Sequence, residues 1–135
     1  MEKKQKDEVF KAFTAKAVQR LKDKKVRKYE TLYVPSIDQN IKIRNLDYPE
    51  IVECTEIEDA GDPNASDKYC IYLAVVEPDL KEVAIELKDQ GEIKTYPEVV
   101  NIFDMHEITS IATEVMKLSK VIGSKRVTVV EELKN

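Results

Sequence analysis

The chain has few of the residue types on which catalytic and metal-binding sites are usually built. Its 135 residues include one histidine, two cysteines and three glycines. With His106 alone, histidine-rich zinc sites and nucleophilic catalysis that needs a histidine base elsewhere are excluded. The glycines lie far apart, at positions 61, 91 and 123, whereas a phosphate-binding loop needs closely spaced glycines. We therefore expect no enzyme activity, no metal, no cofactor and no small-molecule substrate.

Long apolar segments are missing as well. No apolar run approaches the roughly 18 residues that a membrane-spanning helix needs, so we expect no membrane association. Residues 1–8 are mostly charged and are not followed by the apolar stretch of a secretory signal, which predicts a cytoplasmic location. Because thiols are reduced in that compartment, we interpret Cys54 and Cys70 as small buried apolar residues rather than as a disulfide or metal ligands.

Charge is unevenly distributed along the chain. Residues 1–28 contain 11 basic and 4 acidic residues, a net +7, whereas residues 29–135 contain 11 basic and 22 acidic residues, a net −11. The simplest interpretation is the solvated face of a lysine-rich helix. Attraction to an acidic partner or to a second copy of the chain is an alternative. Nucleic-acid binding is disfavoured, because base stacking could use only Phe10 and Phe13, which the helix needs for packing.

The pattern of apolar residues predicts a predominantly helical α+β fold in one domain that spans residues 1–135. A small N-terminal β-hairpin should pack against a bundle of four to five helices. Within the domain, residues 1–28 are expected to form a basic, loosely attached helix. Residues 29–122 form the core and residues 123–135 a short C-terminal tail.

The N-terminal third is predicted to hold one helix and the hairpin. In residues 7–24, apolar side chains recur at steps of three and four and so share one helix face. These are Phe10, Phe13, Ala17 and Leu21. Residues 30–34 and 40–44 alternate apolar with polar side chains, and residues 35–38 between them have turn chemistry. This arrangement predicts two antiparallel strands.

Three helices are predicted in the middle of the chain. Asp47 begins a helix that should run to about Glu58. After a loop over residues 60–66, in which Asn64 or Ser66 could act as the helix cap, the uncharged run 69–76 predicts a buried helix. Pro78 should end that helix near Glu77. The next helix is expected over residues 80–89, where Leu80, Val83, Ala84 and Leu87 share a face and Gly91 ends it.

The last predicted helix has the longest amphipathic pattern. Pro97 is expected to open a short helical turn before it. Asp104 and Glu107 have the spacing of a capping box, which predicts the start of the helix, and Gly123 its end. The apolar stripe between them consists of Met105, Ile108, Ile111, Ala112, Val115, Leu118 and Ile122.

Two groups of potential metal ligands lack the spacing that a metal-binding motif requires. A metalloprotease helix needs His-Glu-x-x-His, but Ser110 stands where the second histidine should follow His106 and Glu107. We therefore interpret His106 as a polar residue of a first helical turn. Asp59, Asp62 and Asp67 lack the alternation and the distal glutamate of a calcium-binding loop.

Three segments, taken in order, resemble the tail assembly chaperones of long-tailed phages and prophages of Gram-positive bacteria. They are residues 41–46, which lead into an acidic helix, residues 72–81, and the closing helix 103–122. The resemblance covers roughly residues 29–122. It does not extend to the basic N-terminal segment, since many family members are acidic or neutral there.

The resemblance implies a non-enzymatic role. Proteins of this family coat the long helical tape measure protein before the tail tube forms, keep its apolar surfaces from aggregating, and hand it over to tube subunits. The implied partners are the tape measure protein, the tail tube protein and further copies of the chain, in the bacterial host cytoplasm. The sequence assigns no residue to partner binding. The alternative is a nucleic-acid-binding regulatory protein that uses the basic residues 3–28.

Overall fold

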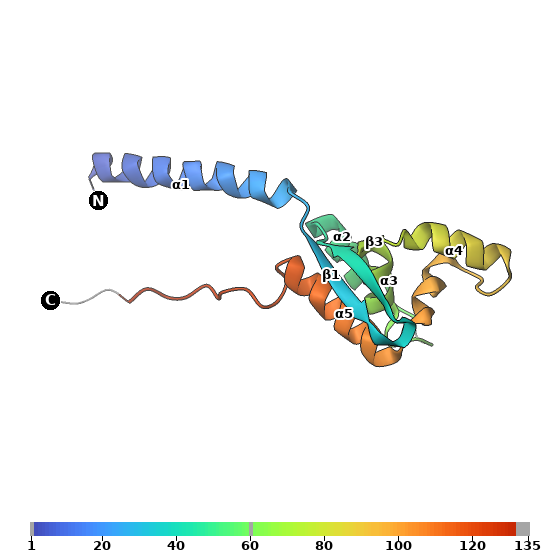
Figure 1. The fold of residues 1–135 in the computed structure, drawn as a ribbon. Coiled ribbons are helices and arrows are strands. Elements are labelled where there is room, and N and C mark those ends of the chain that lie inside the picture. Colours follow the sequence, from blue (N-terminus) through green and yellow to red (C-terminus); the bar gives the residue numbers. More distant parts are fainter. Residues whose placement is uncertain (1, 60, 132–135) are drawn as a thin grey trace.

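The computed structural model describes residues 2–59 and 61–131 and shows a helical protein with one small sheet (Figure 1). The predicted α+β class with predominant helix is confirmed. The elements are α1 (Lys3–Lys25), β1 (Tyr29–Val34), η1 (Pro35–Ile37), β2 (Gln39–Arg44), α2 (Tyr48–Thr55), α3 (Ala65–Ala74), β3 (Val75–Glu77), α4 (Leu80–Asp89), η2 (Tyr96–Ile102) and α5 (Met105–Leu118).

The predicted hairpin is present. Strands β1 and β2 pair antiparallel from Tyr29 opposite Arg44 to Val34 opposite Gln39. The short 3₁₀ helix η1 forms the turn and ends at Asp38, whose φ of 49° lies in the left-handed region that aspartate tolerates. Because side chains alternate along a strand, Leu32 and Val34 of β1 and Ile41 and Ile43 of β2 face the core, while Tyr29 and Tyr33 are exposed. Of these, Ile41 and Ile43 are fully buried.

A third strand replaces the predicted end of the buried helix. Helix α3 stops at Ala74, and residues 75–77 form β3, which pairs antiparallel with β2. The prediction of helix as far as Glu77 is therefore wrong. A short uncharged run cannot distinguish a buried helix from a buried strand, and the residue before Pro78 favours extended backbone. The backbone of β2 supplies hydrogen-bond partners that the sequence does not reveal.

Two further helices end earlier than predicted. Helix α2 ends at Thr55 instead of Glu58. Helix α5 ends at Leu118, because Lys120 adopts a φ of 65° and the Val121 amide donates to the Met116 carbonyl (2.9 Å). This Schellman arrangement satisfies the last carbonyls and turns the chain away. The predicted starts at Asp47 and Asp104 and the predicted helix 80–89 are confirmed.

The core lies between the sheet and the helices that follow it. Helices α3 and α5 pack against each other, and α5 also covers β1 and β2. All buried apolar residues in the described ranges fall between Val34 and Val115. None of the helices described has both the length and the apolar character needed to cross a membrane.

Helix α1 extends away from this core (Figure 1). None of its residues is buried. The expectation that Phe10 and Phe13 are used for packing is wrong within this chain, since they are 71% and 73% exposed. The predicted helix is present, but its apolar face is weakly developed, because Arg20 and Lys24 share it, and no surface of its own core lies against it.

Candidate functional site

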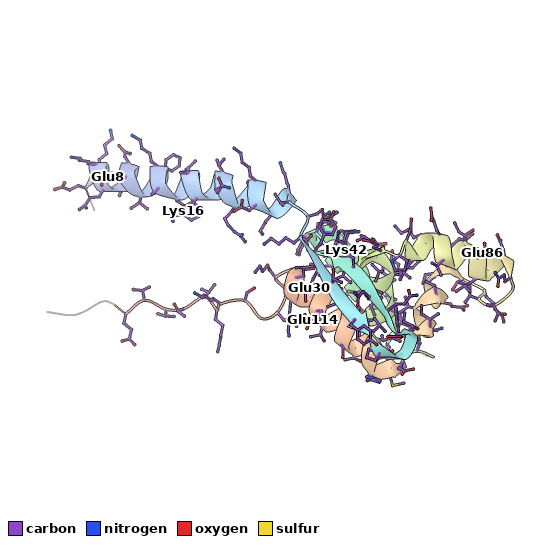
Figure 2. All side chains as sticks on the ribbon, viewed as in Figure 1. Glu8, Lys16, Glu30, Lys42, Glu86 and Glu114 are labelled. Carbon is purple, nitrogen blue, oxygen red and sulfur yellow. The ribbon has the colours of Figure 1, made fainter. Side chains whose placement is uncertain are left out.

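The exposed helix α1, here called the basic arm, is the first candidate interaction surface. Its apolar residues remain in solvent, while charged side chains such as Glu8 and Lys16 project from it (Figure 2). The last turn carries Lys22, Lys24 and Lys25, where positive charge interacts favourably with the helix dipole. The exposed apolar residues of the arm are Val9, Phe10, Phe13, Val18 and Leu21. A basic helix with these residues in water is suited to bind an apolar, acidic partner.

The base of the arm is fixed to the core by polar contacts. The Arg27 guanidinium donates to the Asn45 carbonyl (3.1 Å) and contacts Glu50 (3.3 Å). The Lys28 amide donates to the Asn45 side-chain oxygen (2.9 Å). These bonds hold the segment after α1 in place, so the direction in which the arm leaves the core is defined although the arm itself is solvated.

Glu50 is the centre of this anchor. Its carboxylate accepts two hydrogen bonds from Arg44, at 2.9 and 2.6 Å, and one from the Asp47 amide at 3.1 Å. The Arg44 hydrogen bonds are the main reason that the pKa of Glu50 falls from 4.5 to about 2. The ion pair joins β2 to α2 directly below the base of the arm.

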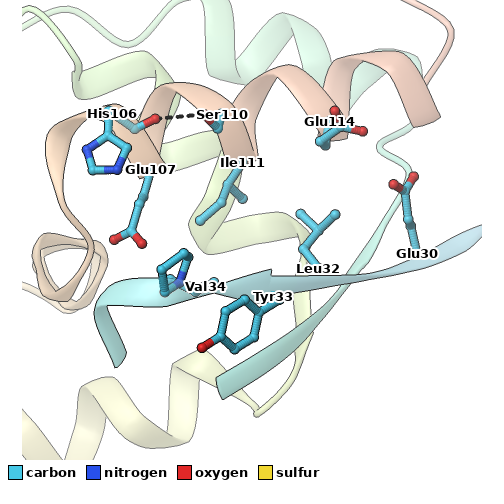
Figure 3. Close-up of a pocket in the computed structure, with 10 residues that line it drawn as sticks. Glu30, Leu32, Tyr33, Val34, His106, Glu107, Ser110, Ile111 and Glu114 are labelled. Carbon is cyan, nitrogen blue, oxygen red and sulfur yellow. Dashed lines mark hydrogen bonds between the residues drawn. The ribbon is translucent and has the colours of Figure 1, made fainter. Parts of the chain in front are cut away.

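A groove between β1 and α5 is the second candidate surface (Figure 3). Its volume is about 490 Å³. The strand contributes Leu32 and Val34 to an apolar floor, which Ile111 of the helix completes, while Glu30 and Glu114 lie toward one end. The remaining lining residues are Tyr33, Pro35, His106, Glu107 and Ser110. The groove therefore combines an apolar floor with acidic groups.

Glu107 closes the other end of the groove and is a buried acid. Its carboxylate accepts hydrogen bonds from the Ser36 amide (3.0 Å), the Ser36 hydroxyl and the Asp104 amide (2.9 Å). The Ser36 hydroxyl bond is the main cause that lowers the pKa of Glu107, so this carboxylate stays ionised. The predicted capping box thus also ties the turn of the hairpin to the start of α5.

One group of potential metal ligands includes Glu107. Oxygen or nitrogen atoms of Asp104, His106 and Glu107 lie within 4.8 Å of one another. Both oxygens of Glu107 already accept hydrogen bonds from protein groups. Ser110, at the position where a zinc helix would have its second histidine, donates to the His106 carbonyl (2.8 Å). This arrangement is that of a capped helix start.

The two cysteines are buried and free, as their predicted role as small core residues requires. Cys54 lies on α2 and Cys70 on α3. The hydrogen bond between the thiols and the burial of the site raise the pKa of the Cys70 thiol. A thiol held in its protonated form is a poor nucleophile.

The carboxylates of the acidic loop before α3 form hydrogen bonds and an ion pair that stabilise this loop. Asp62 accepts from the Asn64 amide (2.9 Å) and forms an ion pair with Lys68 (2.6 Å). Asp59 accepts from the Gly61 amide (2.9 Å). Asp67 lies in the first turn of α3, where burial raises its pKa. The three acids are distributed over separate contacts and do not converge on one point.

From the sequence, the basic residues 3–28 were an alternative binding segment, whereas the groove was not identified. The charge and periodicity of residues 7–24 were visible, but exposure of Phe10 and Phe13 depends on where the core lies. The groove joins residues 30–35 to residues 106–114, which only the fold brings together. No family model, curated protein or solved structure matches the chain, so a function has to be argued from these surfaces and from the residues themselves.

Proposed function

We propose that this chain is a tail assembly chaperone of a long-tailed phage or prophage. In this proposal it binds the tape measure protein in the bacterial cytoplasm, keeps it soluble and helps to recruit tail tube subunits. The observation that carries the proposal is the basic arm, a 23-residue helix with exposed phenylalanines and no buried residue. The order of segments between residues 41 and 122 that resembles this chaperone family supports the same role.

The arm suits a filamentous helical client. Apolar surface in water costs about 25 cal/mol per Å², so both the arm and an apolar helix stripe of the client gain when they cover each other. Recognition of one amphipathic helix by another uses side chains at steps of three and four, which is the spacing of Phe10, Phe13, Ala17 and Leu21. Nothing in this role requires a catalytic group.

Self-association strengthens such binding. The N-terminal segment carries +7 and the remainder −11, so the arm of one copy attracts the core of the next. Copies bound side by side on one filament gain from effective concentration, and each contact can be weak while the coat persists. Light scattering with client at low and high salt tests this: a monomer mass under both conditions contradicts it.

The test of client binding is co-expression with a tape measure fragment, scored by the soluble fraction of that fragment. The double variant Phe10→Ser with Phe13→Ser should lose most of the solubilising effect while its own core stays folded. Ala12→Ser with Ala15→Ser is the matched control, because these residues lie on the opposite face of the same helix. Equal solubilisation by both variants would reject the arm as the client site.

The alternative function is a regulatory protein that binds nucleic acid through the same arm. The observation in its favour is that the arm is basic and free in solvent. Counterion release would make such binding fall steeply with salt. A gel shift at low salt that disappears on substituting Lys22, Lys24 and Lys25 would favour this alternative, and no shift at low salt would eliminate it.

A further inference from the structure

In the part of the chain that the structure describes, the sheet has two outer strands, β1 and the short β3. Its strand order is β1-β2-β3, so β1 is an outer strand whose far side pairs with no described strand. An outer strand presents a row of unpaired amide and carbonyl groups that can pair with a further strand. The groove described above lies beside this strand, between β1 and α5.

Of the β1 residues that line the groove, the three on the less exposed face of the strand alternate along it, and Tyr33 adds to the lining from the other face. Glu30, Leu32 and Val34 line it, and α5 adds Ile111 and Glu114. Figure 3 shows Glu30 and Glu114 close to each other at one end, with Leu32 and Ile111 further along. A strand that pairs with β1 would therefore meet a negative charge first and apolar side chains after it.

The C-terminal segment 125–131 has the complementary pattern. It reads Lys-Arg-Val-Thr-Val-Val-Glu, and four of its seven residues are β-branched, the class enriched in strands. Lys125, Val127 and Val129 would share one face of an extended strand. In the structure this segment is extended, Val127 and Val129 are almost wholly exposed, and the chain leads away from the core (Figure 1).

We propose that residues 125–131 of one copy add as a fourth strand to the free edge of β1 in a second copy. The added strand runs parallel to β1, because only that direction places Lys125 beside Glu30. Val127 and Val129 then follow along the apolar floor beside Leu32 and Val34. Main-chain hydrogen bonds provide affinity, and the alternating side chains set the register.

The occupant is a second copy because of how α5 ends. Lys120 and Gly123 both have positive φ, at 65° and 75°, and the Schellman bonds fix residues 119–121. This ending directs the tail away from its own groove (Figure 1). Exchange of an identical segment between copies is a low-cost route to association. The inference rests on the proposed function only in that self-association is part of it, and it is tested without any client.

The experiment measures the mass of the full chain by analytical ultracentrifugation over a range of concentrations. We expect association above the monomer mass of 15.5 kDa. Truncation after Ser124 should leave a folded monomer with unchanged core stability. Val127→Ser with Val129→Ser should weaken association by at least about 100-fold, from two lost apolar contacts. Thr128→Ser with Val130→Ser, which changes the opposite face, is the matched control and should associate like the parent chain.

A charge exchange tests the register. Glu30→Lys and Lys125→Glu should each weaken association, and the two together should restore it. Three results would overturn the proposal: equal association after truncation, a full chain that is monomeric with freely exchanging tail amides, or a monomer whose tail amides are protected. The last would place the tail in its own groove. Any of these leaves client solubilisation by the arm unaffected, so the two failures are distinguishable.

Discussion

Helices α1 and α5 both have apolar residues at steps of three and four, but only α5 separates them cleanly from its charged residues. In α5 the apolar stripe covers the sheet and α3, and Ile108, Ile111 and Val115 are buried. In α1 the stripe stays in solvent. The difference teaches that apolar residues at helical spacing predict a helix, whereas burial against a core goes with a stripe that charged residues do not interrupt.

The two helices also differ in how their ends are fixed. Near its start, α5 has a buried carboxylate, Glu107, that holds the hairpin turn, and Ser119 at its C-cap accepts a hydrogen bond from Leu46, two residues after β2. Helix α1 is held only past its end, by Arg27 and Lys28. The arm therefore depends on its own sequence for helical stability, whereas most helices in proteins gain theirs from tertiary packing of an apolar face.

The largest effect should follow from removing an apolar residue of α5. Ile108→Ala should lower the free energy of unfolding by about 3 kcal/mol, because it leaves a cavity in the core. Chemical denaturation measures the loss. A change below about 1 kcal/mol would mean that α5 is not buried against the core.

A smaller loss is expected at the anchor between the two regions. Glu50→Gln should cost about 2 kcal/mol at neutral pH, because it removes charged hydrogen bonds from Arg44. The folded pKa of about 2 lies below the ordinary 4.5, so this contribution is complete above about pH 5 and is lost as the pH falls toward 2. Denaturation of both proteins at pH 7 and pH 2.5 should show the difference shrinking; a constant difference would contradict the assignment.

A substitution at the end of α5 should lower the free energy of unfolding by about 1 kcal/mol. The Ser119 hydroxyl accepts from the buried Leu46 amide (2.8 Å) and donates to the Val115 carbonyl (2.7 Å). Ser119→Ala leaves the Leu46 amide without this partner, which costs about 1 kcal/mol. Ser110→Ala removes a hydroxyl that bonds only its own helix and should be nearly neutral. Equal thermal midpoints for the two variants would count against the tertiary role of Ser119.

The smallest effect should follow from changes in the arm. Deletion of residues 2–25 should alter the free energy of unfolding of the core by less than about 0.5 kcal/mol, since no arm residue is buried. Amide hydrogen exchange should be fast along α1 and slow in α3 and α5. Slow exchange in α1 of the isolated protein would show that the arm has a partner, and a large loss on deletion would place that partner in the core.

Much of the fold could be predicted from local signals. Turn residues 35–38 and alternation in the strands predict the hairpin, and the capping residues Asp47 and Asp104 mark two helix starts. The strand at Val75–Glu77 could not be predicted, because an uncharged run fits a helix or a strand and its pairing partners, Lys42 and Ile43, belong to a distant segment of the chain. The groove could not be predicted from the sequence either, because its acidic and apolar residues come from two distant segments.

By itself, the sequence determined the approximate positions of the helices and the hairpin, the caps and turns at which they begin, and that a basic N-terminal segment precedes an acidic remainder. These features depend on neighbours within a few positions in the chain. The tertiary structure decided that Val75 joins a sheet, that α5 is buried while α1 is not, and that Glu30 lies near Glu114. Each of these depends on contacts between segments far apart in sequence, and burial is a property of the assembled core rather than of any local pattern.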